Sequence, residues 1–180
     1  MNNKEKMLNG ELYNPIEDNL PKEREYAKLL CHKFNNLSPD NISERANTIK
    51  SILGKVKGNF LIEQPFYCDY GYNIEIGENF YSNHNLVILD PAKVSFGDNV
   101  FIGPCACFTN DKYPVRINYE LQGPKVRRGA SIGGNTTFLS NFASPVPKFA
   151  VVVVLPTPPF WLATQIILPN LQYLLYSHIQ

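Results

Sequence analysis

Helical hydrophobic spacing marks the N-terminal part of the chain. Residues 21–36 predict an amphipathic helix with a proline in its first turn, and residues 38–54 predict a second helix that starts at a Ser-Pro cap. The expected apolar face of the first helix consists of Tyr26, Leu29, Leu30 and Phe34. That of the second consists of Ile42, Ala46, Ile49 and Leu53. With a short polar helix before residue 15, the pattern predicts a helical leader over residues 1–57.

Short β-type runs replace the helical pattern from Phe60 onward, and one corner motif recurs between them. The motif is an apolar residue, Gly, any residue and Asn, and it reads IGEN at 76–79, FGDN at 96–99 and IGGN at 132–135. Gly and Asn tolerate the positive φ of tight turns. Each copy therefore predicts a corner between two short strands, with its apolar residue pointing into a core.

The spacing of these corners predicts a parallel β-helix over residues 58–140, so the expected fold class is mainly β. Gly97 follows Gly77 by 20 residues, and apolar positions recur about every six residues, as in a solenoid with three short strands per coil. Gly133 follows Gly97 by 36 residues, which fits two coils or one coil with an extruded loop. Residues 109–126 are rich in charged and turn residues, so the loop is favoured.

The tail at residues 141–180 has a different composition. Lys148 is the one Lys, Arg, Asp or Glu after Arg128, and six of the 14 prolines fall in the same stretch. Residues 149–168 contain no charge, but three prolines interrupt their centre, which argues against a membrane helix. Two interpretations stay open: a cap over the open end of the solenoid, and a segment from a shifted or rearranged reading frame, which is favoured.

Net charge and cysteine spacing argue against two classes of function. Lys+Arg 17 against Asp+Glu 16 leaves a formal charge of +1 without a long basic block, so nucleic acid is not an expected partner. The polar N-terminus lacks the apolar core of a secretory signal, which predicts a cytoplasmic protein. The four cysteines lack metal-ligand spacing, which favours buried thiols in a reducing compartment over a zinc site. No metal is expected.

Three segments resemble the maltose and galactoside O-acetyltransferases, members of the left-handed β-helix acyltransferases with hexapeptide repeats. They are KEKMLNGELYN, PFYCDYGYNIEIGENFYSNHNLVILD and VSFGDNVFIGP, and the resemblance covers about residues 4–104. Residues 105–140 look more like hexapeptide N-acetyltransferases that modify nucleotide-linked amino sugars. The resemblance implies a left-handed parallel β-helix with an N-terminal α-helical unit. It also implies a homotrimer that binds acetyl-CoA in the groove between two subunits, beside the acceptor sugar.

In the resembled O-acetyltransferases, the catalytic base is a loop histidine immediately before a proline, and the aligned position here is Tyr113. A sugar hydroxyl needs a base during attack, which contributes about 10²- to 10⁴-fold, and a tyrosine of ordinary pKa is a poor base at neutral pH. His84 is a candidate for a displaced base, although a solvated or hydrogen-bonded bystander is the favoured interpretation. An amine acceptor attacks with its own lone pair, so N-acetylation of a nucleotide-linked amino sugar is the alternative function.

The resemblance also implies candidate residues for the acceptor and the cofactor. Asn83 matches a position that holds an acceptor hydroxyl, and Asp69 matches a second acceptor position, whereas corner or turn residues are the structural alternatives. Asn14 stands where the family usually has an acidic residue. Asn110 would line the acceptor pocket in the N-acetyltransferases or cap a loop. Ser140 would border the pantetheine arm of acetyl-CoA.

The predicted function is transfer of an acetyl group from acetyl-CoA to a sugar hydroxyl. Tyr113 and Asn83 are the candidate catalytic residues, and Asn83 and Asp69 would orient the acceptor. Because the hexapeptide pattern stops near residue 140, a degenerate scaffold that keeps the solenoid but not the chemistry is the non-enzymatic alternative.

Overall fold

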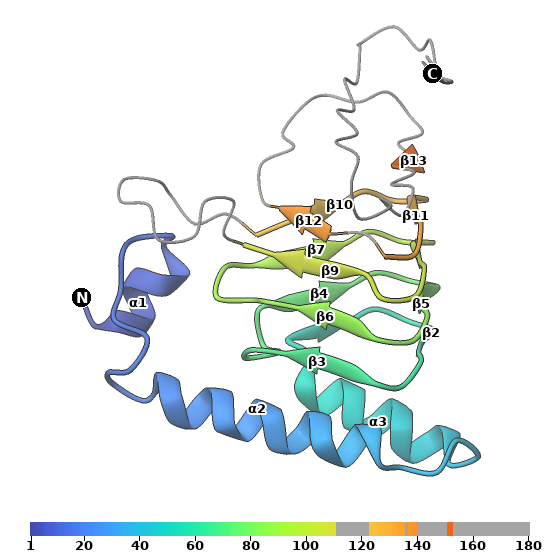
Figure 1. The fold of residues 1–180 in the computed structure, drawn as a ribbon, viewed down its shortest axis with the longest axis horizontal. Coiled ribbons are helices and arrows are strands. Elements are labelled where there is room, and N and C mark those ends of the chain that lie inside the picture. Colours follow the sequence, from blue (N-terminus) through green and yellow to red (C-terminus); the bar gives the residue numbers. More distant parts are fainter. Residues whose placement is uncertain (111–122, 136, 140–150, 153–180) are drawn as a thin grey trace, which may run out of the picture.

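The helices of the leader lie at the base and along one side of a three-sided solenoid (Figure 1). The computed structural model describes residues 1–110, 123–135, 137–139 and 151–152. Helix α1 spans Asn3–Leu8, α2 spans Leu20–Asn35 and α3 spans Ile42–Ile52. Within these ranges, no helix has the length and apolar character needed to cross a membrane.

Each coil of the solenoid contributes one strand to each of three parallel sheets. The first coil contains β1 (Lys55–Val56), β2 (Phe60–Ile62) and β3 (Phe66–Cys68), and the second contains β4 (Ile74–Ile76), β5 (Phe80–Ser82) and β6 (Leu86–Ile88). The third contains β7 (Val94–Phe96), β8 (Phe101–Ile102) and β9 (Cys107–Thr109), and the fourth contains β10 (Lys125–Val126), β11 (Ser131–Ile132) and β12 (Thr137–Leu139). Strand β13 (Val151–Val152) pairs with β11. The sheet orders are β1-β4-β7-β10, β13-β11-β8-β5-β2 and β12-β9-β6-β3.

Strand register places the insertion between the third and fourth coils. Tyr81 pairs with Phe101, an offset of 20 residues, whereas Phe101 pairs with Ser131, an offset of 30 residues. About ten additional residues therefore lie between β9 and β10, so the long corner interval contains one coil with an insertion rather than two coils. The IGGN corner at 132–135 is consequently equivalent to residues 102–105.

Asparagine, rather than glycine, takes the positive φ at the repeated corners. Asn79, Asn99 and Asn135 have φ angles of 55°, 56° and 54°. Gly77 is needed for a different reason, because a Cβ atom there would lie 2.5 Å from the carbonyl carbon of Gly97 in the next coil. The motif predicted the corners, but close packing between coils requires its glycine and backbone conformation favours its asparagine.

The buried face of α2 differs from the predicted one. Its buried residues are Leu20, Ala27, Cys31 and Phe34. Tyr26 and Leu29 are exposed, so this part of the predicted face was wrong. The sequence pattern favoured the large apolar side chains, whereas α2 packs on β3 through small residues that allow a close approach.

Helix α3 begins later than predicted, and Ile42 is exposed. The Asn41 N–H donates to the Ser38 carbonyl at 3.0 Å, so the Ser-Pro segment forms a turn before the helix. The buried residues of α3 are Arg45, Thr48, Ile49 and Ile52. The Arg45 guanidinium pairs with the Glu63 carboxylate at 2.9 Å, which ties the leader to the first coil.

Inward side chains of successive coils form one continuous core. Phe96 packs edge-to-face between Phe80 and Phe108, with ring centroids 5.1 and 4.9 Å apart. Phe34 of α2 and Ile49 of α3 belong to the same core, so the leader closes the first coil of the solenoid. This rigid stack fixes the positions of the corners, where the candidate site residues lie.

Candidate functional site

Two edges of the solenoid carry the predicted site residues that the structure describes, apart from Asn14 in the leader. The second corner is the turn between the middle and last strands of a coil, at residues 63–65, 83–85, 103–105 and 133–135. The third corner is the turn toward the next coil, at residues 69–73 and 89–93, and its equivalent in the third coil starts at residue 110. Asn83 lies at the second corner, whereas Asp69 and Asn110 lie at the third.

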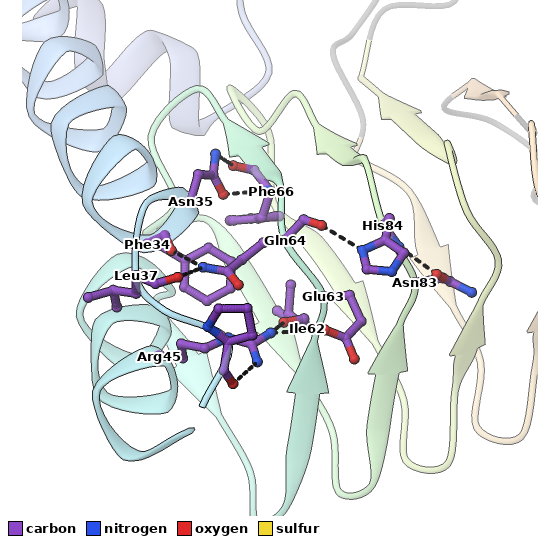
Figure 2. Close-up of polar contacts among 11 residues, drawn as sticks. Phe34, Asn35, Leu37, Arg45, Ile62, Glu63, Gln64, Phe66, Asn83 and His84 are labelled. Atoms are coloured by element: carbon purple, nitrogen blue, oxygen red, sulfur yellow. Dashed lines mark hydrogen bonds and ion pairs between the residues drawn. The ribbon is translucent and has the colours of Figure 1, made fainter. Parts of the chain in front are cut away.

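Hydrogen bonds to the backbone N–H and to the side-chain oxygen hold Asn83 in the second corner (Figure 2). Its N–H donates to the Ile102 carbonyl at 2.9 Å, and its Oδ1 accepts the His84 N–H at 2.8 Å. An asparagine that stabilises a turn was the structural alternative for this position, and the structure gives Asn83 that role. The amide Nδ2 is the remaining donor group through which Asn83 could bind an acceptor hydroxyl.

The ring of His84 is oriented by a backbone carbonyl. Its Nδ1 lies 2.6 Å from the carbonyl oxygen of Gln64, one coil below, and its own carbonyl accepts the Cys105 N–H at 2.8 Å. Because a carbonyl oxygen only accepts hydrogen bonds, this contact assigns the proton to Nδ1 in the neutral ring and leaves the lone pair on Nε2. His84 is exposed, so Nε2 is accessible for proton transfer.

Gln64 connects this corner to the leader. Its side-chain amide donates to the Leu37 carbonyl at 2.9 Å, just after the end of α2, and also to the Phe34 carbonyl. The helical leader therefore positions the carbonyl that orients His84. The sequence pattern did not reveal Gln64, because its role depends on contacts with residues 27 and 30 positions away.

Asp90 holds the third corner from inside. One carboxylate oxygen accepts the N–H groups of Asp69 at 3.0 Å and Tyr70 at 2.9 Å, whereas Oδ2 is buried without a hydrogen-bond partner among the described residues. Burial raises the pKa of Asp90 to about 6, the Tyr70 N–H partly offsets this, and the nearby Asp69 carboxylate adds to it. Sequence reasoning missed Asp90, although an aspartate directly after an apolar strand was a visible signal.

Asp90→Asn is expected to flatten the pH dependence of stability. The folded-state pKa of Asp90 is about 6, whereas an unfolded aspartate titrates near 3.9. The protonated carboxyl therefore contributes stability below about pH 4 that is lost as the pH rises through about 6, on the order of 3 kcal/mol. Thermal melting between about pH 4.5 and 8 tests this: the wild-type midpoint should fall with rising pH, while the variant should change less and melt higher at pH 8.

The control for this experiment is Asp98→Asn. Asp98 is a surface carboxylate whose pKa is lowered, first by the Glu78 N–H and then by Lys57, so its contribution is lost only at lower pH. The Asp98 variant should keep the fall of stability between about pH 4.5 and 6. Parallel curves for wild type and Asp90→Asn would contradict the role of Asp90.

The leader packs against the third corner through Arg24. Its two terminal nitrogens donate to the Tyr70 hydroxyl at 2.7 Å and to the Pro15 carbonyl at 2.6 Å.

Burial raises the pKa of Asp69, and the positive charges of Arg24 and Lys28 partly offset this. Asp69 therefore lies at a half-buried position where a carboxylate can accept hydrogen bonds from a sugar.

Asn14 has a structural role within the leader. Its N–H donates to Asn3 at 2.8 Å, its Nδ2 donates to Glu17 at 2.7 Å, and its Oδ1 accepts the Ile16 N–H at 3.2 Å. These bonds organise the loop between α1 and α2. The loop is close to the third corner, because Arg24 binds both Pro15 of the loop and Tyr70 of that corner.

The structure separates the two groups of predicted acceptor residues. Asp69 shares its register position with Leu89, six residues after Asn83 along the same sheet. Strand β6, with three extended residues that span about 10 Å, lies between the two corners, so Asn83 and Asp69 sit at opposite ends of this sheet. Asn110 is buried at the third corner, in the same register position as Asp90. Tyr113 and Ser140 lie outside the described residues.

Two of the three outer faces of the solenoid differ in character. The sheet of β1, β4, β7 and β10 presents a polar row at Lys55, Glu75, Ser95 and Lys125. The sheet of β2, β5 and β8 presents an apolar row at Leu61, Tyr81 and Phe101, in which the Tyr81 and Phe101 rings stack with centroids 5.2 Å apart. Among the described residues, no three His, Cys, Asp or Glu side chains come together as a metal site.

Comparison with known protein families matches the leader to the maltose acetyltransferase hexapeptide capping motif, over residues 6–58. A protein of Saccharomyces cerevisiae, whose name describes an acetyltransferase without a stated substrate, is 46% identical over 73% of this chain and 67% of its own length. Galactoside O-acetyltransferase of Escherichia coli is 35% identical over 73% of this chain and 64% of its own length. The chain thus spans about two thirds of the length of these relatives.

Two solved structures share both the fold and substantial sequence identity. A maltose O-acetyltransferase from Clostridium difficile superposes with a TM-score of 0.64 at 33% identity, over 77% of this chain and 84% of that protein. A galactoside acetyltransferase in complex with coenzyme A gives a TM-score of 0.60 at 31% identity, over 77% and 78% of the two chains. The predicted fold class, a left-handed parallel β-helix with an N-terminal helical unit, is confirmed.

Proposed function

Because this chain belongs to the maltose and galactoside O-acetyltransferase family of hexapeptide-repeat acyltransferases, we propose that it transfers acetyl groups from acetyl-CoA to a sugar hydroxyl. The observation that carries this proposal is the joint match of leader and solenoid to an acetyltransferase solved with coenzyme A. Acetyl-CoA is the proposed co-substrate, its thioester supplies the activated acetyl group, and the proposed reaction includes no metal step. A cytoplasmic location is part of the proposal.

The proposed acceptor site forms between copies of the chain in a homotrimer. Asn83 at the second corner and Asp69 at the third corner sit at opposite ends of the sheet that contains β3 and β6, so in this proposal the two residues that hold one acceptor come from different copies. The apolar row of Leu61, Tyr81 and Phe101 supports such an assembly, since Leu61 and Phe101 are 41% and 45% exposed in one chain. A second copy on this face would bury these side chains.

Residue roles follow from this arrangement. Asn83 donates a hydrogen bond from Nδ2 to the acceptor, and Asp69 accepts one from a second hydroxyl. Asn110 and Asn14 shape the acceptor pocket from the third corner and the leader, and Ser140 borders the pantetheine arm of acetyl-CoA. Tyr113 occupies the base position.

His84 is the alternative base in this proposal, because its Nε2 lone pair is exposed beside Asn83. A sugar hydroxyl that is bound by Asn83 would lie near this lone pair. Substitution of His84 by Gln keeps a hydrogen-bonding side chain but removes the titratable ring, so it separates the base role from a purely structural role.

N-acetylation of a nucleotide-linked amino sugar is the second candidate function. One observation favours it: Tyr113 stands where a histidine would serve a hydroxyl acceptor, and an amine acceptor does not need that base. Under this alternative the loss of His84 should not reduce turnover, since the acceptor supplies its own lone pair.

Release of the CoA thiol by the purified chain tests the proposal, with maltose, glucose, glucosamine and a nucleotide-linked amino sugar as acceptors. Turnover with maltose or glucose supports O-transfer, whereas preference for the amino sugars supports N-transfer. If neither the wild type nor Tyr113→His releases CoA with any acceptor, and acetyl-CoA does not bind at about millimolar concentration, the chain is a scaffold without catalytic activity.

Asn83→Ala is expected to raise KM for the acceptor by roughly tenfold, the effect of losing about one neutral hydrogen bond of 1–1.5 kcal/mol. The matched control is Asn83→Asp, in which the carboxylate still accepts the His84 N–H but cannot donate to the sugar. Steady-state kinetics and thermal melting of both variants separate the two roles. Asn83→Asp with the wild-type melting midpoint and the wild-type KM would contradict a hydrogen bond donated by Asn83 to the acceptor.

A further inference from the structure

Two buried thiols face each other between the leader and the solenoid. Cys31 on α2 and Cys68 at the end of β3 are 2% and 7% exposed, and their Sγ atoms lie 3.7 Å apart. Neither thiol has a role in the proposed acetyl transfer. A pair of sulfur atoms at contact distance needs a combined movement of about 1.7 Å to reach the disulfide bond length of about 2.05 Å.

Local hydrogen bonds hold the backbone around both cysteines in place. The Asn35 side chain, one turn after Cys31, donates to the Phe66 carbonyl at 3.0 Å and accepts the Phe66 N–H at 2.8 Å. Phe66 lies two residues before Cys68 and on the same side of β3. These two hydrogen bonds between Asn35 and Phe66 fix α2 against β3, so the two thiols meet in the folded protein without a rearrangement of the chain.

The pair is reachable from outside through a depression of about 630 Å³ between α2 and the start of β3. Both cysteines line this depression together with Lys28, His32 and Tyr67. The hydrogen bond shared by the two thiols lowers the pKa of Cys31, although burial opposes this, and the same bond together with burial raises the pKa of Cys68. Cys31 is therefore the better thiolate of the two, although the Asp90 carboxylate opposes negative charge there.

We propose that Cys31 and Cys68 are a redox-active dithiol that a peroxide oxidises to an intramolecular disulfide. The Cys31 thiolate attacks one oxygen of hydrogen peroxide, the O–O bond breaks, and the sulfur becomes a sulfenic acid with release of one water. The Cys68 sulfur then attacks the sulfenic sulfur, forms the S–S bond and releases the second water. Two thiols lose two electrons in total, and one peroxide becomes two molecules of water.

The disulfide would make the contact between leader and solenoid covalent. It closes a loop of 37 residues between positions 31 and 68, which restricts the unfolded chain. For a loop of this length, a rise of the melting midpoint by about 10 °C is expected. Thiol reduction reverses the change, so the site acts as a reversible modification site in a reducing compartment.

The experiment oxidises the full chain with hydrogen peroxide and then blocks the free thiols with iodoacetamide. Peptide mass mapping should identify the 31–68 disulfide, the thiol count should fall from four to two, and the melting midpoint should rise and return after dithiothreitol. The matched control is a Cys105→Ser, Cys107→Ser double variant, which changes cysteines outside the buried pair and should respond like the wild type.

The mapping of wild-type protein decides the proposal even where a Cys31→Ser or Cys68→Ser variant fails to fold. A disulfide between other positions, sulfinic or sulfonic acid at Cys31 without cross-linking, or four thiols left after oxidation would each overturn it. This proposal does not depend on the acetyltransferase activity. If the proposed acetyl transfer is disproved, the redox dithiol still stands, and the reverse also holds.

Discussion

Tyr113→His is expected to raise kcat for sugar hydroxyl acceptors by about 10²-fold, the lower end of the contribution of a positioned general base. A tyrosine of ordinary pKa stays protonated until the pH approaches about 10, so it does not accept a proton at neutral pH, whereas imidazole has an available lone pair there. A histidine at this position restores the residue that the resembled O-acetyltransferases use. Turnover is measured as CoA-thiol release with maltose and glucose, and the gain should fade below about pH 6 as the imidazole becomes protonated.

Tyr113→Phe is the matched control, since it keeps the ring but supplies no base and should not gain activity. Acceptors with a free amine provide an internal comparison, because their attack needs no base and the gain from histidine should be small. An equal gain with glucosamine and maltose, or no gain at all with hydroxyl acceptors, would contradict the assignment of position 113 as the base position.

Gly77→Ala is expected to destabilise the solenoid by on the order of 3 kcal/mol and to lower the melting midpoint by about 10 °C. The added Cβ would lie 2.5 Å from the Gly97 carbonyl carbon and 2.6 Å from the Asp98 nitrogen. Both atoms belong to the backbone of the next coil, which is fixed by the parallel ladder on either side of the corner. The strain cannot be relieved by a side-chain rotation, so the coils must separate.

Gly133→Ala is the matched control for this substitution. Gly133 follows β11 at another corner of the same solenoid, and among the described residues a Cβ at that position meets no atom within 4 Å. The control should change the free energy of unfolding by less than about 0.5 kcal/mol. Thermal melting and soluble yield are measured for both variants, and equal effects would show that inter-coil contact is not what requires glycine at position 77.

The solenoid could be predicted from the sequence because its rules are local. A coil of about 20 residues repeats the same turn and the same inward apolar positions, so Ile88, Val100 and Ile102 can be assigned to the core from spacing alone. The corner asparagines also follow a local rule, since positive φ depends on the residue itself. The buried face of α2 was harder to predict, because the buried Ala27 and Cys31 are small and contribute little to the hydrophobic pattern.

The candidate site was predictable only in part. The resemblance pointed to Asn83 and Asp69, but Gln64 and Asp90 contribute through contacts that join distant segments, such as the Gln64 carbonyl to His84 and the Asp90 carboxylate to Tyr70. Such contacts leave no periodic pattern in a single sequence. The same holds for Cys31 and Cys68, which are 37 positions apart and show no recognisable spacing.

The sequence by itself determined the helical leader, the parallel β-helix and the family resemblance, and it supplied the prediction that Tyr113 stands at the base position. These properties rest on residue type, short-range spacing and motif, which the chain carries before it folds. Only the tertiary structure decided which face of α2 is buried, why Gly77 must be glycine, that Asn83 and Asp69 lie at different corners, and that Cys31 meets Cys68. The physical reason is that close packing and hydrogen bonding act between atoms that are neighbours in space, and stacking of coils makes neighbours of residues 20 or more positions apart.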